Sequence, residues 1–496
     1  MIPNLLLALL IPALISFGML FTLRNCPALV AATISIAAII LSLFMLLLGM
    51  PDVLTNGSLL ETYKWIPYIA ATEFGLLLDG LSFPISAISA FITLVLVIYS
   101  TKYMEARDKQ GGYYGNLLLL YVGTQGVFLS TNLFQFYLFW ELTLIPAYFL
   151  MLFWSESNEL NGAVRNAAIK FFMFTHIASL FLLLGIILVF STTGTLNMLA
   201  LQTLHPSSSV LDVIKIAMIC MLIGFFVKMG IVPGHNWLPD TYVHAPLPVT
   251  AMISGIMAKI GAYGIVRLTA LAFSEAIFSY SLIIAFIAFV SMLYGSIMAL
   301  AQEDVKRFLA YSSISQSGYI VLGVASVSVI GLTGAAFHIV NHAIIKVLLF
   351  LCAGSYIQQI GSHNLNSFRG LVKKMPVTSG AILIASLSLA GIPPLNGFFS
   401  EFLIFAGAFT NLNIIIVAVP AVLSVGLTFS YFLWLIYRIF VSKPQDSVEG
   451  IQESPLSLTV PILLLTLLVV LIGIWPNTIL IFLSKWAESL TLLGGT

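Results

Sequence analysis

Long apolar runs, separated by short polar segments or by glycine and proline, recur along the whole chain. Most runs are about 18 to 25 residues long, which is the length an α-helix needs to cross the hydrocarbon core of a membrane. The pattern predicts fourteen transmembrane helices, centred on residues 12, 38, 88, 121, 144, 180, 223, 260, 288, 318, 345, 392, 425 and 470. The first run, residues 2–23, has no basic residue before it and is expected to be retained rather than cleaved as a signal peptide. Two helices are expected to meet with almost no loop at residues 130–132.

The composition supports an all-α polytopic membrane protein. Hydrophobic residues make up 60% of the 496 residues and charged residues only 8%, with a mean hydropathy of +1.07. A soluble domain of this size could not cover its surface with so few polar groups. The formal net charge of +1 gives no electrostatic basis for binding nucleic acid. Cys26, Cys220 and Cys352 are far apart and lack the spacing of a metal, iron–sulfur or dithiol site, so no cofactor is expected in this chain.

The distribution of basic residues predicts the orientation. Outside the spans, the odd-numbered loops carry twelve lysines and arginines, against four on the other side, one of which is Arg267. Because basic residues favour the cytoplasmic side, both termini are predicted to be extracytoplasmic. Lys306 and Arg307 are assigned to a cytoplasmic loop, where orientation alone accounts for them.

Two stretches of the chain resemble each other. Residues 166–179 align with 342–355, with five identities that include Lys170 and Lys346, and the motif at 230–237 resembles that at 391–398. The paired spans are the sixth with the eleventh and the seventh with the twelfth, so the copies must cross the membrane in opposite directions. Chance similarity between apolar helices is the alternative, against which the shared Gly/Pro motif argues. The expected parts are three N-terminal helices (1–110), two inverted repeats (111–275 and 276–442) with broken seventh and twelfth helices, and a C-terminal helix (443–496).

Six ionisable side chains stand within predicted spans, where a charge at the bilayer centre costs roughly 2.5 to 3.5 kcal/mol. They are Glu141, Lys170, Lys228, Lys259, Lys346 and Glu401. Pro233 and the pair Pro393 and Pro394 interrupt the spans that carry Lys228 and Glu401. Since a proline frees a backbone carbonyl, we expect a hydrated break beside each of these two charges. A purely structural kink is the alternative.

Glu141 and Lys228 are the pair expected to exchange a proton, because a buried carboxylate and a desolvated lysine can share one near neutral pH. A static salt bridge between two helices is the alternative. His338, His342 and Lys346 are spaced i, i+4 and i+8, so they lie along one helical face, which favours a relay over isolated core histidines. A zinc site is not predicted, since the third group on this face is a lysine. For Asp79, at the start of a span, helix capping is the simpler interpretation.

Seven segments, taken together, resemble the antiporter-like membrane subunits of respiratory complex I, a family shared with Mrp-type sodium/proton antiporters and membrane-bound hydrogenases. They are FWELTLIP (139–146), AAIKFF (167–172), VKMGIVPGHNWLPD (227–240), AKIGAYGIVR (258–267), EDVKRFLAYSSIS (303–315), HAIIKVLLFLCAGS (342–355) and GIPPLNGFFSEF (391–402). The resemblance covers roughly residues 75–440. It implies fourteen helices with inverted five-helix repeats at spans four to eight and nine to thirteen.

The resemblance also implies roles for single residues. Glu141 and Lys228 match the paired charges of the fifth and seventh spans, and Lys259 and His342 match positions on the eighth and eleventh. Glu401 stands where most sister subunits carry a lysine, which points to the M-type branch.

The chain departs from the family pattern in three places. Tyr242 and His244 stand where a histidine and then a glutamate are usual, and Gln316 stands where a histidine is common. Lys346 is more typical of the sister subunits than of mitochondrial M-type chains, which indicates a prokaryotic branch. Lys170, His235 and His244 are further candidates for the proton path.

The function implied by the resemblance is that of a proton-translocating membrane-arm subunit of a complex I-like oxidoreductase. Electron transfer in other subunits would drive a proton past Lys228, Lys259, His338, His342 and Lys346 to Glu401. The expected setting is a prokaryotic plasma membrane or a thylakoid, with other membrane-arm subunits, the lipid bilayer and protons or sodium ions as partners. The electron donor (NADH, a deazaflavin or ferredoxin) and the acceptor (quinone or phenazine) stay open. The alternatives are an Mrp-type antiporter or hydrogenase subunit, and a structural spacer.

Overall fold

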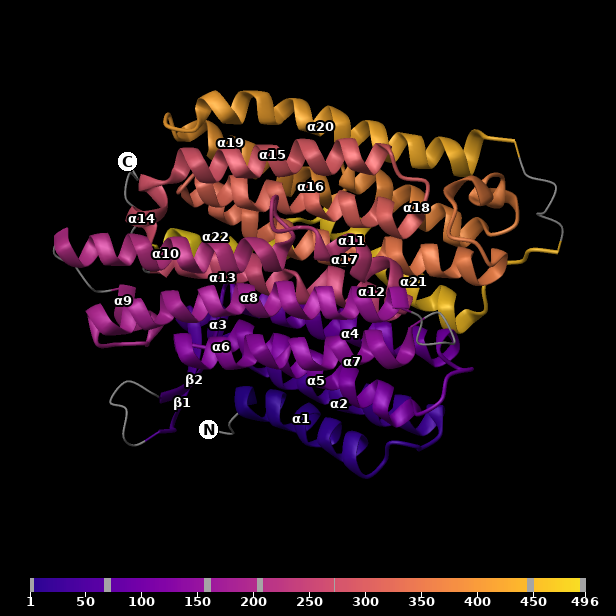
Figure 1. Ribbon diagram of the computed structural model, residues 1–496, viewed down its shortest axis with the longest axis horizontal. Coiled ribbons are helices and arrows are strands. Elements are labelled where there is room, and N and C mark those ends of the chain that lie inside the picture. Colours follow the sequence, from indigo (N-terminus) through magenta and orange to yellow (C-terminus); the bar gives the residue numbers. More distant parts are fainter. Residues whose placement is uncertain are drawn as a thin grey trace.

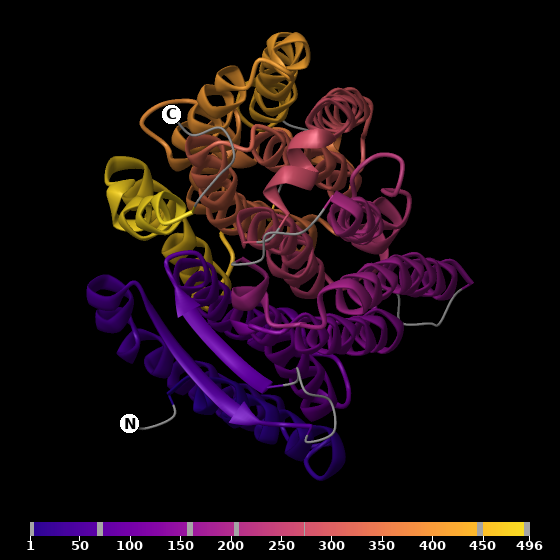
Figure 2. The same ribbon diagram turned by 90° about the vertical axis from the view of Figure 1, so that its left-hand side faces the viewer.

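The computed structural model describes residues 4–66, 73–155, 162–202, 208–271, 273–443 and 450–490. Long helices run side by side along the length of the molecule (Figure 1) and are seen end-on in Figure 2. Within the described residues, eleven helices are long and apolar enough to cross a membrane. The predicted class, a polytopic helical membrane protein, is therefore confirmed.

The elements fall into four stretches of the chain. The first contains α1 (Asn4–Phe21), α2 (Ala28–Leu48), α3 (Met50–Asn56), β1 (Ser58–Lys64), β2 (Glu73–Asp79) and α4 (Ser82–Tyr103). The second contains α5 (Gln110–Leu129), α6 (Leu133–Leu142), α7 (Leu144–Trp154), α8 (Gly162–Thr193), α9 (Met198–Gln202), α10 (Ser208–Met229), α11 (Trp237–His244), α12 (Leu247–Met252), the π-helical turn η1 (Ile253–Met257) and α13 (Lys259–Leu271).

The third stretch contains α14 (Ser274–Ser279), α15 (Ser281–Leu300), α16 (Val305–Ala325), α17 (Val329–Ile360), the short 3₁₀ turns η2 (Leu365–Phe368) and η3 (Leu371–Lys373), α18 (Pro376–Leu389), α19 (Asn396–Thr410), α20 (Ile415–Ile436) and the π-helical turn η4 (Tyr437–Val441). The fourth contains α21 (Leu456–Ile474) and α22 (Asn477–Glu488).

The predicted span centres all fall on helices or on a break between two helices. Eleven coincide with the helices just counted, and the other three fall on α5, on α16 and between α18 and α19. The helices expected to meet at residues 130–132 do so, because α5 ends at Leu129 and the side chain of Asn132 accepts hydrogen bonds from the first amides of α6. The total of fourteen crossings stays a prediction.

Helix α17 lies at the centre of the bundle. Every residue from Gly331 to Ile357 is buried, and the segment Leu247–Leu268, which contains η1, is buried as completely. These segments therefore contact other helices on all sides rather than lipid. Ionisable groups on them face protein, which is where a membrane protein tolerates them.

A β-hairpin that was not predicted from the sequence covers one end of the bundle. Strands β1 and β2 pair antiparallel, with Ser58 opposite Asp79. The carboxylate of Glu61 accepts hydrogen bonds from the amides of Leu5 (3.0 Å) and Leu6 (3.1 Å), so the hairpin caps the start of α1. Burial, with the hydrogen bond to Glu61 and its charge, raises the pKa of Tyr63 to about 12.

The hairpin, the start of α1 and helix α22 lie at the same end of the bundle (Figure 1). Because the chain begins and ends at the same end of the bundle within the described residues, this placement agrees with an even number of membrane crossings. The side of the membrane that this end faces stays a prediction.

Candidate functional site

Two helix breaks with the same backbone geometry lie at the positions predicted from the repeated Gly/Pro motif. Gly230 and Gly391 end α10 and α18 with φ angles of +74° and +71°, a region that glycine enters without steric cost. In both breaks the next amide bonds back to the helix: Ile231 to the carbonyl of Phe226 (2.8 Å) and Ile392 to that of Leu387 (3.1 Å). The two predicted breaks are therefore observed at Gly230 and Gly391, whereas the numbering of these helices as seventh and twelfth spans and their inverted orientation stay predictions.

The expected hydrated gap at the first break is not needed to satisfy its backbone. The carbonyl of Val227 accepts a hydrogen bond from the indole N–H of Trp237 (2.8 Å), and that of Met229 accepts one from Ser317 (3.1 Å). The freed carbonyls thus find protein donors, one from the chain beyond the break and one from α16. The hydrated break itself stays a prediction.

The expected direct pair between Glu141 and Lys228 is not formed among the described residues. The ammonium of Lys228, which is fully buried, donates to Thr143 Oγ1 (3.1 Å) and lies 5.2 Å from the ring centroid of Trp140. Glu141 Oε2 instead lies 3.4 Å from Nδ1 of His176 on α8. Adjacent residues on a helix point in different directions, so Trp140 and Thr143 face α10 while Glu141 faces α8.

Lys259 follows the π-helical turn η1, which inserts an extra residue per turn and shifts the direction of the side chains after it. The side chain is buried and donates to no described residue. It borders a cavity of about 10 Å³, together with Ser89 of α4 and Ile339 and Ala343 of α17. A cavity of this size holds about one water molecule. The cavity therefore lies between Lys259 and α17.

The three groups predicted to share a face of α17 do so, but they point to different partners. The rings of His338 and His342 lie 5.8 Å apart, and Nδ1 of His338 is 3.0 Å from the hydroxyl of Ser400 on α19. Lys346 turns instead to α16, where it donates to the carbonyl of Leu309 (3.0 Å) and to the hydroxyl of Ser312. Lys346 therefore does not lie between the histidines and Glu401, which corrects the order expected from the sequence.

Glu401 is buried beside the second break, next in sequence to Ser400. A Cβ atom built on Gly391 would lie 2.8 Å from Glu401 Oε2, so the carboxylate rests against the glycine of the break. By strict hydrogen-bond geometry its other oxygen has no described partner, although the amide of Gln316 on α16 lies near enough to interact with the carboxylate. The acid is thus held by packing against Gly391 and by the nearby amide of Gln316.

We expect Gly391→Ala to destabilise the protein by about 1 kcal/mol or more. An alanine must adopt a left-handed conformation there, which costs roughly 1 to 2 kcal/mol, and its methyl group displaces the carboxylate of Glu401. Thermal unfolding of the full chain in detergent measures the effect. Gly380→Ala on α18 is the matched control, because a Cβ there meets no atom within 4 Å. Equal unfolding temperatures for the two variants would contradict the prediction.

Lys170 belongs to a charged cluster around α11 rather than to the line of buried groups. Its ammonium lies 2.7 Å from Asp240, which also pairs with Arg307 at 3.5 Å. Lys306 is fully buried and donates to the carbonyls of Val243 (3.2 Å) and Ala245 (3.1 Å) at the end of α11. The assignment of Lys306 and Arg307 to a loop was therefore wrong, because α16 begins at Val305 and packs these side chains against α11.

The two remaining candidate histidines lie near this cluster. His235 is buried in the first break with its ring 4.8 Å from that of Tyr294 on α15, and its Nδ1 has no described partner. His244 is the last residue of α11. Neither contacts the histidines of α17 in the described part of the chain.

Asp79 caps α4 as expected and also forms a buried ion pair that the sequence did not indicate. Its carboxylate accepts hydrogen bonds from the amides of Leu81 (3.1 Å) and Ser82 (2.9 Å). The guanidinium of Arg267, only 2% exposed, binds both oxygens at 2.5 and 2.8 Å and also contacts the hydroxyl of Tyr263. Arg267, counted as a loop residue, is thus an internal link between the hairpin and α13.

Three functional candidates were missed at the level of the sequence. His176, Asp240 and Arg267 each partner a group that was singled out, and each comes from another helix. One weak indication for His176 lies in the sequence: in the internal repeat it aligns with Cys352, so an ionisable side chain stands at this position in both copies. No group of three or more potential metal ligands occurs among the described residues.

Comparison with known proteins agrees with this architecture. The model of the family described as NADH:quinone oxidoreductase/Mrp antiporter, transmembrane, matches residues 130–428, and that of the N-terminal part of NADH-ubiquinone oxidoreductase chain 5 matches residues 65–114. The chain belongs to the NADH:quinone oxidoreductase/Mrp antiporter family. The predicted relationship is confirmed.

Relatives in this family are named as subunits of oxidoreductase complexes. The chain is 31% identical to F(420)H(2) dehydrogenase subunit M of Methanosarcina mazei, over 88% of this chain and 87% of that protein. It is 32% identical to NADH-quinone oxidoreductase subunit M of Pseudomonas aeruginosa (82% and 79% covered) and 34% identical to subunit N of Desulforudis audaxviator (83% and 84%).

Solved structures of the family share the fold over nearly the whole chain. The Mrp complex from Dietzia sp. matches with a TM-score of 0.89 at 25% identity, covering 99% of this chain and 98% of the other. Respiratory complex I from Thermus thermophilus matches with a TM-score of 0.86 at 24% identity, with 98% of both chains covered.

Proposed function

We propose that this chain is the M-type, proton-translocating membrane-arm subunit of a complex I-like oxidoreductase. One observation carries the proposal: titratable groups occupy four successively packed helices in the buried core. Lys228 lies on α10, Lys259 on α13, His342 and His338 on α17, and Glu401 on α19. Helix α10 packs against α13, α13 against α17, and α17 against α19. A static fold has no need for this many ionisable groups in one line through apolar protein.

The proposed path follows the order in which these helices pack against one another. A proton leaves Lys228 for Lys259 and then reaches His342, which lies within electrostatic reach of Lys259. It passes to His338, which is hydrogen-bonded to Ser400 on α19, and from there to Glu401 on the same helix. Lys346, about 12 Å along α17 from His338 by helix geometry, stores charge beside the path rather than carrying the proton.

The pair of Glu141 and His176 is the proposed control element. Glu141 lies within electrostatic reach of Lys228 without touching it, and its carboxylate lies 3.4 Å from His176 on another helix. A change in the distance between Glu141 and His176 would therefore alter the attraction of Glu141 to Lys228. Redox chemistry in the partner subunits would act through such a change. The proposal does not specify the electron donor, the electron acceptor or whether the transported ion is a proton or sodium.

We expect Lys228→Met, in the assembled complex, to slow proton transfer through this subunit by about 10²-fold, the usual effect of removing a proton-transferring group. Methionine keeps the contact with Trp140 and removes only the titratable group. The measurement is the number of protons moved per electron in proteoliposomes. Lys215→Met on the same helix, where the lysine pairs with Asp212 at 3.8 Å, is the matched control. Unchanged pumping in Lys228→Met would favour the structural-spacer alternative.

A sodium/proton antiporter of the Mrp type is the second candidate, because the Mrp complex shares the fold over the whole chain. The two functions differ in their energy source. Ion exchange driven by a sodium or pH gradient in proteoliposomes, without any electron donor, would support the antiporter. The subunits that co-purify with the chain distinguish the candidates independently.

A further inference from the structure

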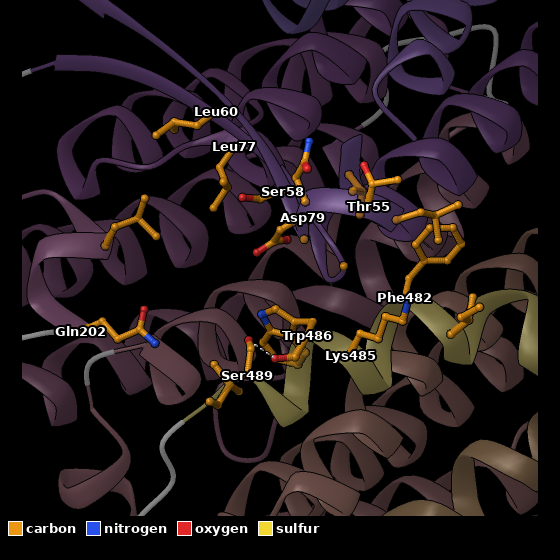
Figure 3. Close-up of a pocket in the computed structure, with 18 residues that line it drawn as sticks. Thr55, Ser58, Leu60, Leu77, Asp79, Gln202, Phe482, Lys485, Trp486 and Ser489 are labelled. Carbon is orange, nitrogen blue, oxygen red and sulfur yellow. Dashed lines mark hydrogen bonds between the residues drawn. The ribbon is translucent and has the colours of Figure 1, made fainter. Parts of the chain in front are cut away.

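We propose that the pocket between the β-hairpin and α22 binds the phosphate headgroup of an anionic phospholipid. The pocket has a volume of about 470 Å³, within the range of small-molecule sites. Its walls come from α3, both strands of the hairpin, α9 and α22, which are far apart in sequence. In Figure 3, Asp79 lies between the hairpin residues and the side chains of Phe482, Lys485 and Trp486 on α22.

Among the described lining residues, the one charge without an ion-pair partner is the positive charge of Lys485. Asp79 is the single carboxylate among the described lining residues, and Arg267 binds both of its oxygens. Lys485 forms no ion pair with a described carboxylate, so its charge is available to a ligand. An anionic group entering the pocket therefore meets attraction from Lys485 and little repulsion from Asp79.

Trp486 supplies a hydrogen-bond donor that the protein leaves unused. The residue is only 6% exposed, and its indole N–H has no described partner. A buried donor without an acceptor is costly, so a site that leaves one in place is suited to an acceptor from outside. Gln202 of α9 and Ser58 of β1 add an amide and a hydroxyl to the lining of the same pocket. Together these groups match the oxygens of a phosphate.

The mouth of the pocket indicates an amphiphile rather than a free anion. Leu60 and Ile481, which line the pocket, are 48% and 37% exposed, so apolar side chains are exposed beside the polar groups of the lining. Helix α22 has 12 residues, about 18 Å, and is too short to span a membrane. It buries one face and presents Lys485 beside Trp486, the residue types that anchor helices at the lipid headgroups.

The test uses the full-length chain, purified with its co-purifying subunits, and native mass spectrometry after transfer into phosphatidylglycerol or phosphatidylcholine of the same acyl chains. We expect a retained phosphatidylglycerol whose affinity falls about fivefold in Lys485→Gln and is restored in Lys485→Arg, as expected for one basic residue at an anionic surface. Trp486→Phe, which removes only the N–H, should weaken it as well. Lys64→Gln, an exposed lysine on the same hairpin outside the pocket, should leave it unchanged.

Two outcomes would overturn the proposal. Equal retention of phosphatidylglycerol in Lys485→Gln and Lys64→Gln, with both variants unfolding at the same temperature, would show that the pocket does not select the anion. Competition by inorganic phosphate as strong as that by phosphatidylglycerol would show an anion site without a lipid requirement. Neither outcome bears on the proton path, because no pocket residue belongs to it.

Discussion

Glu401→Gln should abolish this subunit's share of proton translocation while leaving the fold intact. Glutamine has nearly the same shape as glutamate, so the packing against Gly391 is kept, and Oε1 of Glu401 has no described hydrogen bond to lose. An amide cannot accept or release the proton that the proposed path brings to this position. We expect proton transfer to slow by about 10²-fold or more.

The measurement for Glu401→Gln is the proton-to-electron ratio of the assembled complex in proteoliposomes, with the rate of electron transfer recorded in parallel. Glu401→Asp should keep part of the proton transfer, because a carboxylate remains, although on a side chain one methylene shorter. Glu275→Gln, an exposed residue of α14, is the control for removing a negative charge anywhere in the chain. Full pumping in Glu401→Gln would remove Glu401 from the path and move the exit elsewhere.

Arg267→Ala should be the most destabilising of the substitutions considered, by about 3 to 5 kcal/mol. It leaves the carboxylate of Asp79 buried, with only the amides of Leu81 and Ser82 and the hydroxyl of Ser82 as partners. Removing one partner of a buried ion pair costs this much because the remaining charge is uncompensated. Tyr263 also loses its contact with the guanidinium.

Thermal or denaturant unfolding in detergent measures the effect, and a double-mutant cycle isolates the pair. Asp79→Asn combined with Arg267→Ala should recover part of the loss, since no charge is then left buried alone. Lys102→Ala serves as the control, because its pair with Glu105 is exposed and worth at most about 1 kcal/mol. A similar small loss for Arg267→Ala would mean that water reaches Asp79 when the arginine is gone.

The link formed by Arg267 also connects the hairpin to the helix that carries Lys259 of the proposed proton path. Arg267 lies two helical turns after Lys259 on α13, and its partner Tyr263, midway between them, donates to the carbonyl of Phe128 on α5 (2.6 Å). Helix α13, which begins at Lys259, is thus held in position by Arg267 and Tyr263, which are not members of the proposed path. A variant that loosens this link is expected to impair pumping along with stability.

The sequence alone determined the features that depend on local physics. Apolar length defined the spans, because the membrane thickness sets how many residues a helix needs. The glycines and prolines at residues 230–233 and 391–394 defined both breaks, since backbone conformation there follows from the residue types. The spacing of His338 and His342 placed both on one face of α17, because helix periodicity is fixed. The hairpin of β1 and β2 was missed because the expectation rested on helical spans.

The tertiary structure decided which charged groups meet. Glu141 contacts His176 rather than Lys228, Lys170 contacts Asp240, and Asp79 contacts Arg267, which lies 188 residues away in the chain. The rotation of each helix about its axis sets these partners, and that rotation follows from packing against several neighbours at once. Local pattern therefore predicts that a buried charge needs a partner, and only the packed bundle selects which one it has.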